Sequence, residues 1–452
     1  MSDASSSYYF LDEARAGKAG LPSFVHEGTA TGDVRAARAD FPALHQRVNG
    51  HPLAWFDNGA TTQKPRVVLE AMTRFYERDN SNVHRGAHTL AARATDAYED
   101  ARATVARLLG ASSPQEIVFV RGTTEGVNLL ANTLGRSRVG AGDEIVLTTL
   151  EHHANIVPWQ LLAQSVGARL RPVPVDDSGQ VQLDAYAALL TERTKIVALS
   201  HVSNALGTVL PVDSMIAMAK ARGIPVVVDG AQAVAHLPVD VTALGADFYV
   251  FSGHKIFGPT GIGAVYGRRD LLAELPPWQG GGSMIRDVTF EHTTFSGPPA
   301  RFEAGTPSIG DAVGLGAALR YVLALGLPAI AAREDRLARL LTDVLSDIPR
   351  VRLIGTAAHK VAVASFVVEG MRTEDIGRVL DEHGIAVRSG HHCAQPALRR
   401  FGVESSVRAS LAFYNTEDEI HRLGAVLRRM MRTDDVKHWG ATVKKGDLSS
   451  SA

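Results

Sequence analysis

A carboxylate and an amine each follow an apolar run of the sequence, and together they could act on a carbonyl cofactor. The run VVVDGAQA contains Asp229, and the later run FYVFSGHK ends in Lys255. If both runs are strands of one parallel sheet, both side chains lie at the carboxyl edge, where ligands bind. The lysine could form a Schiff base, and the carboxylate could keep a ring nitrogen protonated so that the ring accepts electrons. A structural ion pair is the alternative, and for such a pair taken alone it is the commoner one.

A Gly-Thr-Thr turn predicts a phosphate site. The segment RGTTEGVN, which contains Thr124, follows the apolar run EIVFV and begins a helical pattern. Free backbone N–H groups at a helix N-terminus, together with two hydroxyls, suit a phosphate. A simple threonine cap is the alternative explanation.

Two adjacent histidines follow another predicted strand. His152 and His153 come directly after DEIVLTT, where an imidazole could stack on a flat cofactor ring. Adjacent side chains in an extended segment point to opposite faces, so one metal ion would hardly take both. A solvated or core histidine is the remaining alternative for either one.

The single cysteine, Cys393, lies in the segment AVRSGHHCAQP. Its polar and basic neighbours favour the thiolate and access to it. An inert buried thiol is one alternative. A zinc site made by His391, His392 and Cys393 is another, but consecutive residues form a poor tetrahedral chelate and no fourth ligand is evident. We therefore predict no metal.

The pattern of apolar runs predicts the elements that position these residues. Continuous apolar runs alternate with helix-period segments, which favours a mostly parallel α/β sheet with helices on both faces. The pattern changes near residue 320 and predicts a smaller α/β domain. The predicted strands are 116–120, 143–149, 195–200, 224–229 and 247–252, followed by 361–369. The predicted parts are a mobile arm (1–39), a large domain (40–320), a small domain (321–432) and a tail (433–452).

Composition excludes several classes of protein. The 452 residues include 47 Lys and Arg against 48 Asp and Glu, so the chain lacks the excess of basic residues that is expected of a nucleic-acid-binding protein. One cysteine excludes an intrachain disulfide and fits a reducing cytoplasm. No signal peptide is recognisable, and the most apolar long stretch is interrupted by Arg320 and Pro328. We expect a cytoplasmic protein that does not enter a membrane.

Taken together, the motifs resemble those of the group II (Suf-type) cysteine desulfurases. The resemblance extends from about residue 40 to 430 and implies fold type I, with a large domain built on a mixed, mostly parallel sheet and a smaller α/β domain. It also implies pyridoxal 5'-phosphate as cofactor. The motifs are DNGATTQKP, NVHRG, RGTTEGVN, EHHANIVPWQ, HVSNALGT, VDGAQAV, FSGHK, GPTGIG, GGGSMI, RFEAGTP and RSGHHCAQP.

The resemblance implies a role for each matching residue. Lys255 would hold the cofactor covalently, Asp229 would bind its ring nitrogen, Gln232 its phenolic oxygen, and His152 would stack on the ring. The phosphate would be bound by Thr124, Ser252 and His254, joined by Thr306 from the partner subunit of a homodimer.

The remaining implied roles concern the substrate. Cys393 would be the nucleophile. The substrate carboxylate would be held by Asn204 and Arg408, with Arg388, His84 and Arg85 lining the site.

The implied reaction converts L-cysteine to L-alanine and leaves a persulfide on Cys393. Because the chain has no second cysteine, the sulfur must pass to another molecule, such as an acceptor protein of the SufE or SufU type, for iron–sulfur cluster assembly or sulfur storage. Selenocysteine lyase is an alternative with the same site. A further hypothesis is that the arm, through an apolar cluster at residues 8–11, docks the enzyme as cargo inside an encapsulin-type shell.

Overall fold

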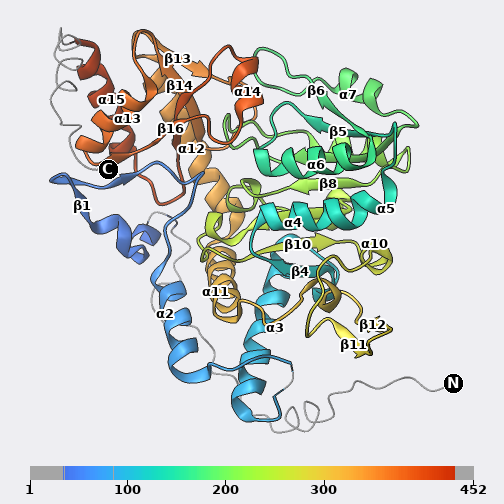
Figure 1. Cartoon of the computed structure of the whole chain (residues 1–452). Coiled ribbons are helices and arrows are strands. Elements are labelled where there is room, and N and C mark those ends of the chain that lie inside the picture. The colour runs from blue at the N-terminus through green and yellow to red at the C-terminus, as the bar shows by residue number, and fades with distance from the viewer. Residues whose placement is uncertain (1–33, 35, 85, 433–452) are drawn as a thin grey trace, which may run out of the picture.

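The computed structural model describes residues 34, 36–84 and 86–432 (Figure 1). Three features of the sequence analysis lie outside these residues. They are the apolar cluster at residues 8–11, Arg85, and the tail at 433–452.

A seven-stranded sheet forms the centre of the larger part of the molecule. All five strands predicted between residues 116 and 252 form, and they belong to this sheet. Five neighbouring strands, β9, β8, β7, β5 and β6, run parallel to one another. Strand β10 is antiparallel to both of its neighbours, β9 and β4. The predicted mixed, mostly parallel sheet is therefore confirmed. The strand order is β4 (Ile117–Val120), β10 (Gly263–Gly267), β9 (Phe248–Ser252), β8 (Val226–Asp229), β7 (Thr194–Ser200), β5 (Glu144–Thr148) and β6 (Arg169–Val173).

Helices cover both faces of this sheet, as Figure 1 shows. Adjacent strand residues alternate between the two apolar cores, because successive side chains of a strand point to opposite faces. Thus Val146 and Val197 belong to one core, while their neighbours Ile145 and Ile196 belong to the other. The first core contains buried residues of α3 (Thr89–Leu109), α8 (Val212–Lys220) and α11 (Ile309–Leu325). The second contains residues of α4 (Thr123–Leu130) and α6 (Val157–Val166).

A second, antiparallel sheet lies in the carboxy-terminal part of the chain. Its order is β13 (Val351–Ile354), β14 (Val363–Val368), β17 (Ser406–Ser410) and β16 (Arg388–Gly390). Its core includes residues of α12 (Leu327–Ser346), α13 (Thr373–Glu382) and α15 (Glu417–Arg432). The early strand β3 (Ala54–Trp55) pairs in parallel with β15 (Ile385–Ala386), so Ala54 and Phe56 join this core.

The remaining elements are short and connect these layers. The helices are α2 (Arg66–Arg74), α5 (Arg136–Arg138), α7 (Leu183–Leu189), α9 (Val241–Leu244), α10 (Arg269–Glu274) and α14 (Gln395–Arg400). The strands are β1 (Arg47–Val48) and β2 (His51–Pro52), and the hairpin of β11 (Ile285–Val288) and β12 (Thr293–Phe295).

Several residues of the predicted arm (1–39) that the structure describes contact the rest of the molecule. Val34 and Ala37 are buried. The Arg38 guanidinium donates to the carbonyl oxygen of Tyr414 at 3.0 Å and pairs with Glu419 at 2.8 Å. These contacts hold Arg38 against the carboxy-terminal part.

Helices α11 and α12 join the two parts of the molecule. They meet at Gly326 with a bend of 77°. Within the described ranges, no single helix is long and apolar enough to cross a membrane. Helices α11 and α12 reach that length and hydropathy only when they are counted together across the bend.

Candidate active site

The ends of two neighbouring strands bring Asp229 and Lys255 to the same edge of the large sheet, as predicted. Strand β8 ends at Asp229 and lies beside β9, which ends at Ser252; a single turn of 3₁₀-helix then carries Lys255. The Asp229 carboxylate is buried and accepts a hydrogen bond from the Ala231 N–H at 2.9 Å. Burial raises the pKa of Asp229, although the Ala231 N–H and Lys255 oppose this effect.

The Lys255 amine has an unusually low pKa. Burial lowers it from 10.5 to about 8, although the negative charge of Asp229 opposes the change. Charge interactions also link Lys255 with Arg408 and with the Cys393 thiol. An amine with this pKa is partly neutral near physiological pH, so it can act as a nucleophile or accept a proton.

Ser252, one of the residues predicted to bind phosphate, forms hydrogen bonds with Thr123, the neighbour of the predicted Thr124. The Ser252 hydroxyl accepts a hydrogen bond from the Thr123 N–H at 2.9 Å and lies 2.9 Å from the Thr123 hydroxyl. Thr124 is exposed in the first turn of α4, whose N-terminus has no side-chain cap. A Cβ atom at Gly122, where φ is +155°, would lie 3.1 Å from the Ser252 oxygen. Glycine therefore keeps this helix end open to a ligand.

The segment before α2 supports the loop that carries Lys255, and the sequence analysis assigned no residue there a role. The carbonyl oxygen of His254 accepts hydrogen bonds from the Thr62 N–H at 3.0 Å and from the Lys64 amine at 3.2 Å. Burial lowers the pKa of Lys64 to about 8. Burial also lowers the pKa of His254 to about 4, and the positive charges of Lys255 and Lys64 contribute. The motif DNGATTQKP was the available signal for this segment.

Gln232 joins the same segment to the site. Its side-chain amide donates a 2.8 Å hydrogen bond to the carbonyl oxygen of Gly59. Gln232 is buried and lies three residues after Asp229, at which β8 ends.

His152 is positioned by the loop after β5. Its Nδ1 accepts a hydrogen bond from the Ala154 N–H at 3.0 Å. Burial, followed by the charges of Lys255, His153 and Arg408, lowers the pKa of His152 to about 3. The ring is therefore neutral at physiological pH and suited to stacking on a flat group.

The buried Glu151 fixes this loop, and the sequence analysis did not identify it. Its carboxylate accepts hydrogen bonds from the Thr148 hydroxyl at 2.6 Å, the Ser200 hydroxyl at 2.5 Å and the Asn155 amide at 2.7 Å. These partners lie at the ends of β5 and β7 and in the turn after His152. One carboxylate thus ties the histidine loop to the edge of the sheet.

Arg408 and Asn204 form a buried polar pair, and the charge of Arg408 also acts on Lys255. Arg408 is 2% exposed and donates to the Asn204 carbonyl oxygen at 2.9 Å, while the Asn204 side-chain amide donates to the His392 carbonyl oxygen at 2.7 Å. Two atoms of this pair, Arg408 Nε and Asn204 Oδ1, are buried without a hydrogen-bond partner. Unsatisfied buried groups of this kind fit a site that binds a polar ligand.

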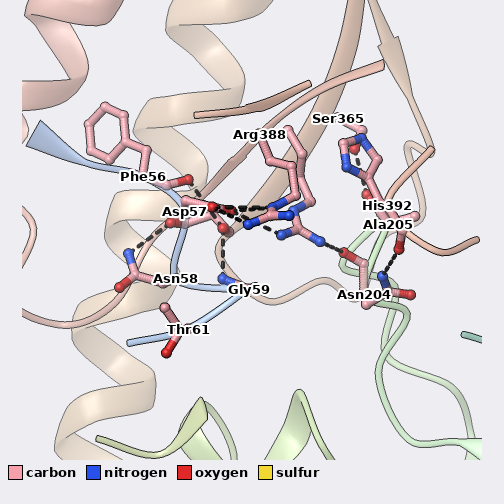
Figure 2. Close-up of polar contacts among 12 residues, drawn as sticks. Phe56, Asp57, Asn58, Gly59, Thr61, Asn204, Ala205, Ser365, Arg388 and His392 are labelled. Atoms are coloured by element: carbon pink, nitrogen blue, oxygen red, sulfur yellow. Dashed lines mark hydrogen bonds and ion pairs between the residues drawn. The ribbon is translucent and has the colours of Figure 1, made fainter. Parts of the chain in front are cut away.

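Asp57 is shared by two arginines, as Figure 2 shows for Asp57 and Arg388. Arg388 donates to its carboxylate from Nη2 at 2.8 Å and from Nε at 3.0 Å, and Arg408 donates at 3.2 Å. Asp57 belongs to the motif DNGATTQKP, yet the sequence analysis gave it no role. Its carboxylate offsets part of the positive charge of Arg388 and Arg408.

The loop that carries Cys393 is exposed and has an unusual backbone. The φ angles of His392 and Cys393 are +52° and +54°, a region that residues other than glycine rarely occupy and that is concentrated at functional sites. The Cys393 carbonyl oxygen accepts a 2.8 Å hydrogen bond from the His153 N–H. The loop is therefore attached to the histidine segment, and the thiol is accessible from solvent.

Two other predicted residues contact different elements. The His84 Nε2 lies 2.9 Å from Glu99 of α3. Although burial raises the pKa of Glu99, hydrogen bonds from His84 and Arg102 lower it to about 2. Thr306 is exposed and accepts a hydrogen bond from the Asn82 amide at 3.3 Å.

The residues at this edge fit pyridoxal phosphate. Lys255 would hold its carbonyl carbon, the open end of α4 beside Gly122 would receive its phosphate, and Asp229 would pair with its ring nitrogen. When bound, the cofactor supplies an electron sink for charge that develops on an amino acid.

Comparison with known proteins places this site in a family. The family model Aminotransferase class-V matches residues 54–423. A cysteine desulfurase of Synechococcus elongatus is 60% identical over 407 residues, which are 90% of this chain and 65% of that protein. A cysteine desulfurase of Dickeya dadantii is 52% identical over 396 residues, which are 87% of this chain and 96% of that protein. The chain thus spans about two thirds of the first relative and nearly all of the second.

Solved structures agree with this assignment. The cysteine desulfurase CsdA from Escherichia coli has a TM-score of 0.82 at 39% identity, covering 88% of this chain and 98% of that one. A variant of the protein C-DES, with glycine covalently linked to its pyridoxal-phosphate cofactor, has a TM-score of 0.74 at 27% identity, covering 86% and 98%. The predicted fold type I and the predicted cofactor are confirmed. The chain therefore belongs to the class-V aminotransferase family of pyridoxal-phosphate enzymes, among the cysteine desulfurases close to the group II (Suf-type) members.

Proposed function

We propose that this chain is a cysteine desulfurase that converts L-cysteine to L-alanine and takes up the sulfur as a persulfide on Cys393. The observation that carries the proposal is the position of the exposed Cys393 thiol. Its loop is held to the His152–His153 segment by the 2.8 Å hydrogen bond from the His153 N–H to the Cys393 carbonyl oxygen, and to Asn204 by the 2.7 Å hydrogen bond to the His392 carbonyl oxygen. This placement supports a reaction at Cys393 while the substrate is held at the lysine.

Different residues around the lysine bind the substrate, accept its proton and cover the cofactor. In this proposal Arg408 receives the substrate carboxylate, because its buried Nε is a donor without a partner, and Asn204 joins it by turning its side-chain N–H from the His392 carbonyl oxygen to the substrate. Lys255 accepts the proton from the substrate Cα, since its lowered pKa leaves a neutral fraction at physiological pH. His152, neutral because of burial, covers the face of the bound cofactor.

The exposed thiol supports transfer of sulfur to an acceptor outside the chain. Cys393 is the only cysteine and is accessible, so the proposed acceptor is another protein, of the SufE or SufU type, serving iron–sulfur cluster assembly or sulfur storage. The proposed enzyme is a cytoplasmic homodimer in which the exposed Thr306 serves the site of the partner subunit. We also propose that the chain divides into a large domain (40–320) and a small domain (321–432), and that residues 8–11 dock to a protein shell.

Replacing Cys393 by serine tests the function directly. Cys393→Ser should keep bound pyridoxal phosphate and substrate but lose desulfurase turnover by orders of magnitude, because a serine hydroxyl is almost never ionised at neutral pH. Alanine and sulfide release from L-cysteine is the measurement, and absorbance of the bound cofactor reports that the site is intact.

Mass spectrometry of the wild type supplies the second test. After treatment with L-cysteine, the peptide that contains Cys393 should carry one added sulfur atom, and a thiol reductant should remove it. Retention of the desulfurase rate in the serine variant would overturn the proposal. So would the absence of a persulfide on a wild type that turns over.

A further inference from the structure

Three side chains that are typical metal ligands lie close together at the loop that carries Cys393. They are His153, His391 and Cys393, whose ligand atoms all lie within 4.8 Å of one another. The rings of His153 and His391 stack with centroids 5.7 Å apart and planes inclined by 30°. His153 follows β5, whereas the other two lie in the loop before α14, so the set exists only in the folded chain.

The hydrogen bonds orient both rings toward the cysteine loop. The Nδ1 of His391 accepts from the Cys393 N–H at 3.0 Å, and the Nε2 of His153 accepts from the Gln395 N–H at 3.3 Å. A ring nitrogen that accepts a hydrogen bond carries a lone pair. Each ring is therefore in the neutral form that binds a metal, and an ion would replace the backbone N–H that now occupies this lone pair.

The backbone holds the two segments in register. The His153 N–H donates to the Cys393 carbonyl oxygen at 2.8 Å, so the distance between the histidine and the cysteine loop is fixed at one point. His391 and Cys393 are exposed, and His153 is partly buried. An ion can therefore enter from solvent without opening the core.

We infer that His153, His391 and Cys393 bind one Zn²⁺ ion, with a fourth position left to water or an incoming thiol. Two imidazoles and one thiolate are a ligand set that zinc favours. Zn–N bonds of about 2.0 Å and Zn–S bonds of about 2.3 Å place tetrahedral ligands roughly 3.3–3.6 Å apart. The observed upper limit of 4.8 Å requires only a modest closing movement, which exposed side chains allow.

This site would control the proposed desulfurase, and in that respect the inference rests on the proposed function. When Zn²⁺ binds, the S–H bond of Cys393 breaks, a Zn–S bond forms, and the proton passes to solvent, so no oxidant or reductant is needed. A thiolate held by zinc cannot take up sulfur. Zinc therefore acts as a reversible inhibitor that masks the nucleophile while the cofactor side of the site stays intact.

Calorimetric titration of the holoenzyme with Zn²⁺ tests the site without any turnover. The wild type should bind one ion per chain at this site. His391→Ala and Cys393→Ser each remove a ligand and should weaken that binding by at least the roughly 10–100-fold that is lost when a residue supporting a metal ligand is removed. His51→Ala is a matched control, because His51 is exposed, is far from Cys393 in sequence, and forms another stacked pair, with His383, whose ring centroids are 5.6 Å apart. This variant should bind Zn²⁺ as the wild type does.

Alkylation of Cys393 by iodoacetamide gives an independent readout. Zn²⁺ should slow alkylation of the wild type and of His51→Ala, and should protect His391→Ala much less. Equal zinc affinity or equal protection in wild type and His391→Ala would overturn the inference, as would a loss in His51→Ala as large as that in His391→Ala. Thermal unfolding checks that each variant is folded. If zinc binds as expected but L-cysteine is not turned over, the proposed function fails and the metal site stands.

Discussion

The N–H of His153 donates a 2.8 Å hydrogen bond to the carbonyl oxygen of Cys393. This bond joins the loop after β5, which also carries His152, to the loop before α14, which carries the nucleophile of the proposed reaction. The two loops are far apart in sequence and belong to different parts of the fold. The position of the thiol relative to the cofactor side of the site therefore depends on a backbone contact that side-chain substitutions leave in place.

Cofactor capture by the apoenzyme should depend on pH through Lys255. Burial lowers the pKa of this amine from 10.5 to about 8, so its neutral, reactive form appears at lower pH than in an ordinary lysine. The rate of pyridoxal-phosphate capture, followed by absorbance, should rise with pH and level off above about pH 8. Asp229→Asn removes the charge that raises this pKa, so it should move the midpoint lower. A midpoint near 10 in the wild type would contradict the assignment, and Lys195→Ala serves as the surface control.

The two arginines that share Asp57 should differ in what they contribute to stability. Asp57→Ala should lower the free energy of unfolding by roughly 3–5 kcal/mol, because it leaves the buried Arg408 without its carboxylate. Arg388→Ala should cost only about 0–1 kcal/mol, since the Arg388 side chain is 47% exposed. Urea unfolding of both variants measures the difference. Equal losses would show that Asp57 does not stabilise Arg408 in particular.

Glu151 should be required for the histidine loop. Glu151→Ala leaves the buried Thr148, Ser200 and Asn155 side chains without an acceptor, at a cost of roughly 1–3 kcal/mol for each group left unsatisfied. We expect a lower free energy of unfolding and a lower desulfurase rate, because His152 loses its support. Glu192→Ala, at an exposed position, is the control. A Glu151→Ala enzyme with wild-type stability would contradict this role.

Truncation should distinguish the described amino-terminal contacts from the residues before them. Removing residues 1–33 should leave the thermal midpoint and the desulfurase rate unchanged. Removing residues 1–38 also deletes the buried Val34 and Ala37 and the pair between Arg38 and Glu419, so it should lower the free energy of unfolding by about 2 kcal/mol or more. Identical midpoints for the two truncated proteins would mean that these contacts stabilise nothing.

The sequence alone was sufficient to predict the large sheet and two residues that lie together at one edge of it. Apolar runs of strand length alternate with helical segments, and this local pattern predicts parallel strands with helices on both faces. Because parallel strands share a carboxyl edge, Asp229 and Lys255 could be placed together before their contacts were known. The cofactor and the family followed from motifs, each of which is a short continuous segment.

The tertiary structure alone decided which residues meet across segments. Asp57 between Arg388 and Arg408, and His153 beside Cys393, join positions whose spacing in sequence has no period or motif. The choice of Thr123 for the contact with Ser252 depends on the rotation of the first turn of α4, which two adjacent threonines in a sequence cannot specify. Local patterns determine elements because they act through neighbouring residues, whereas these pairings depend on how the completed elements pack.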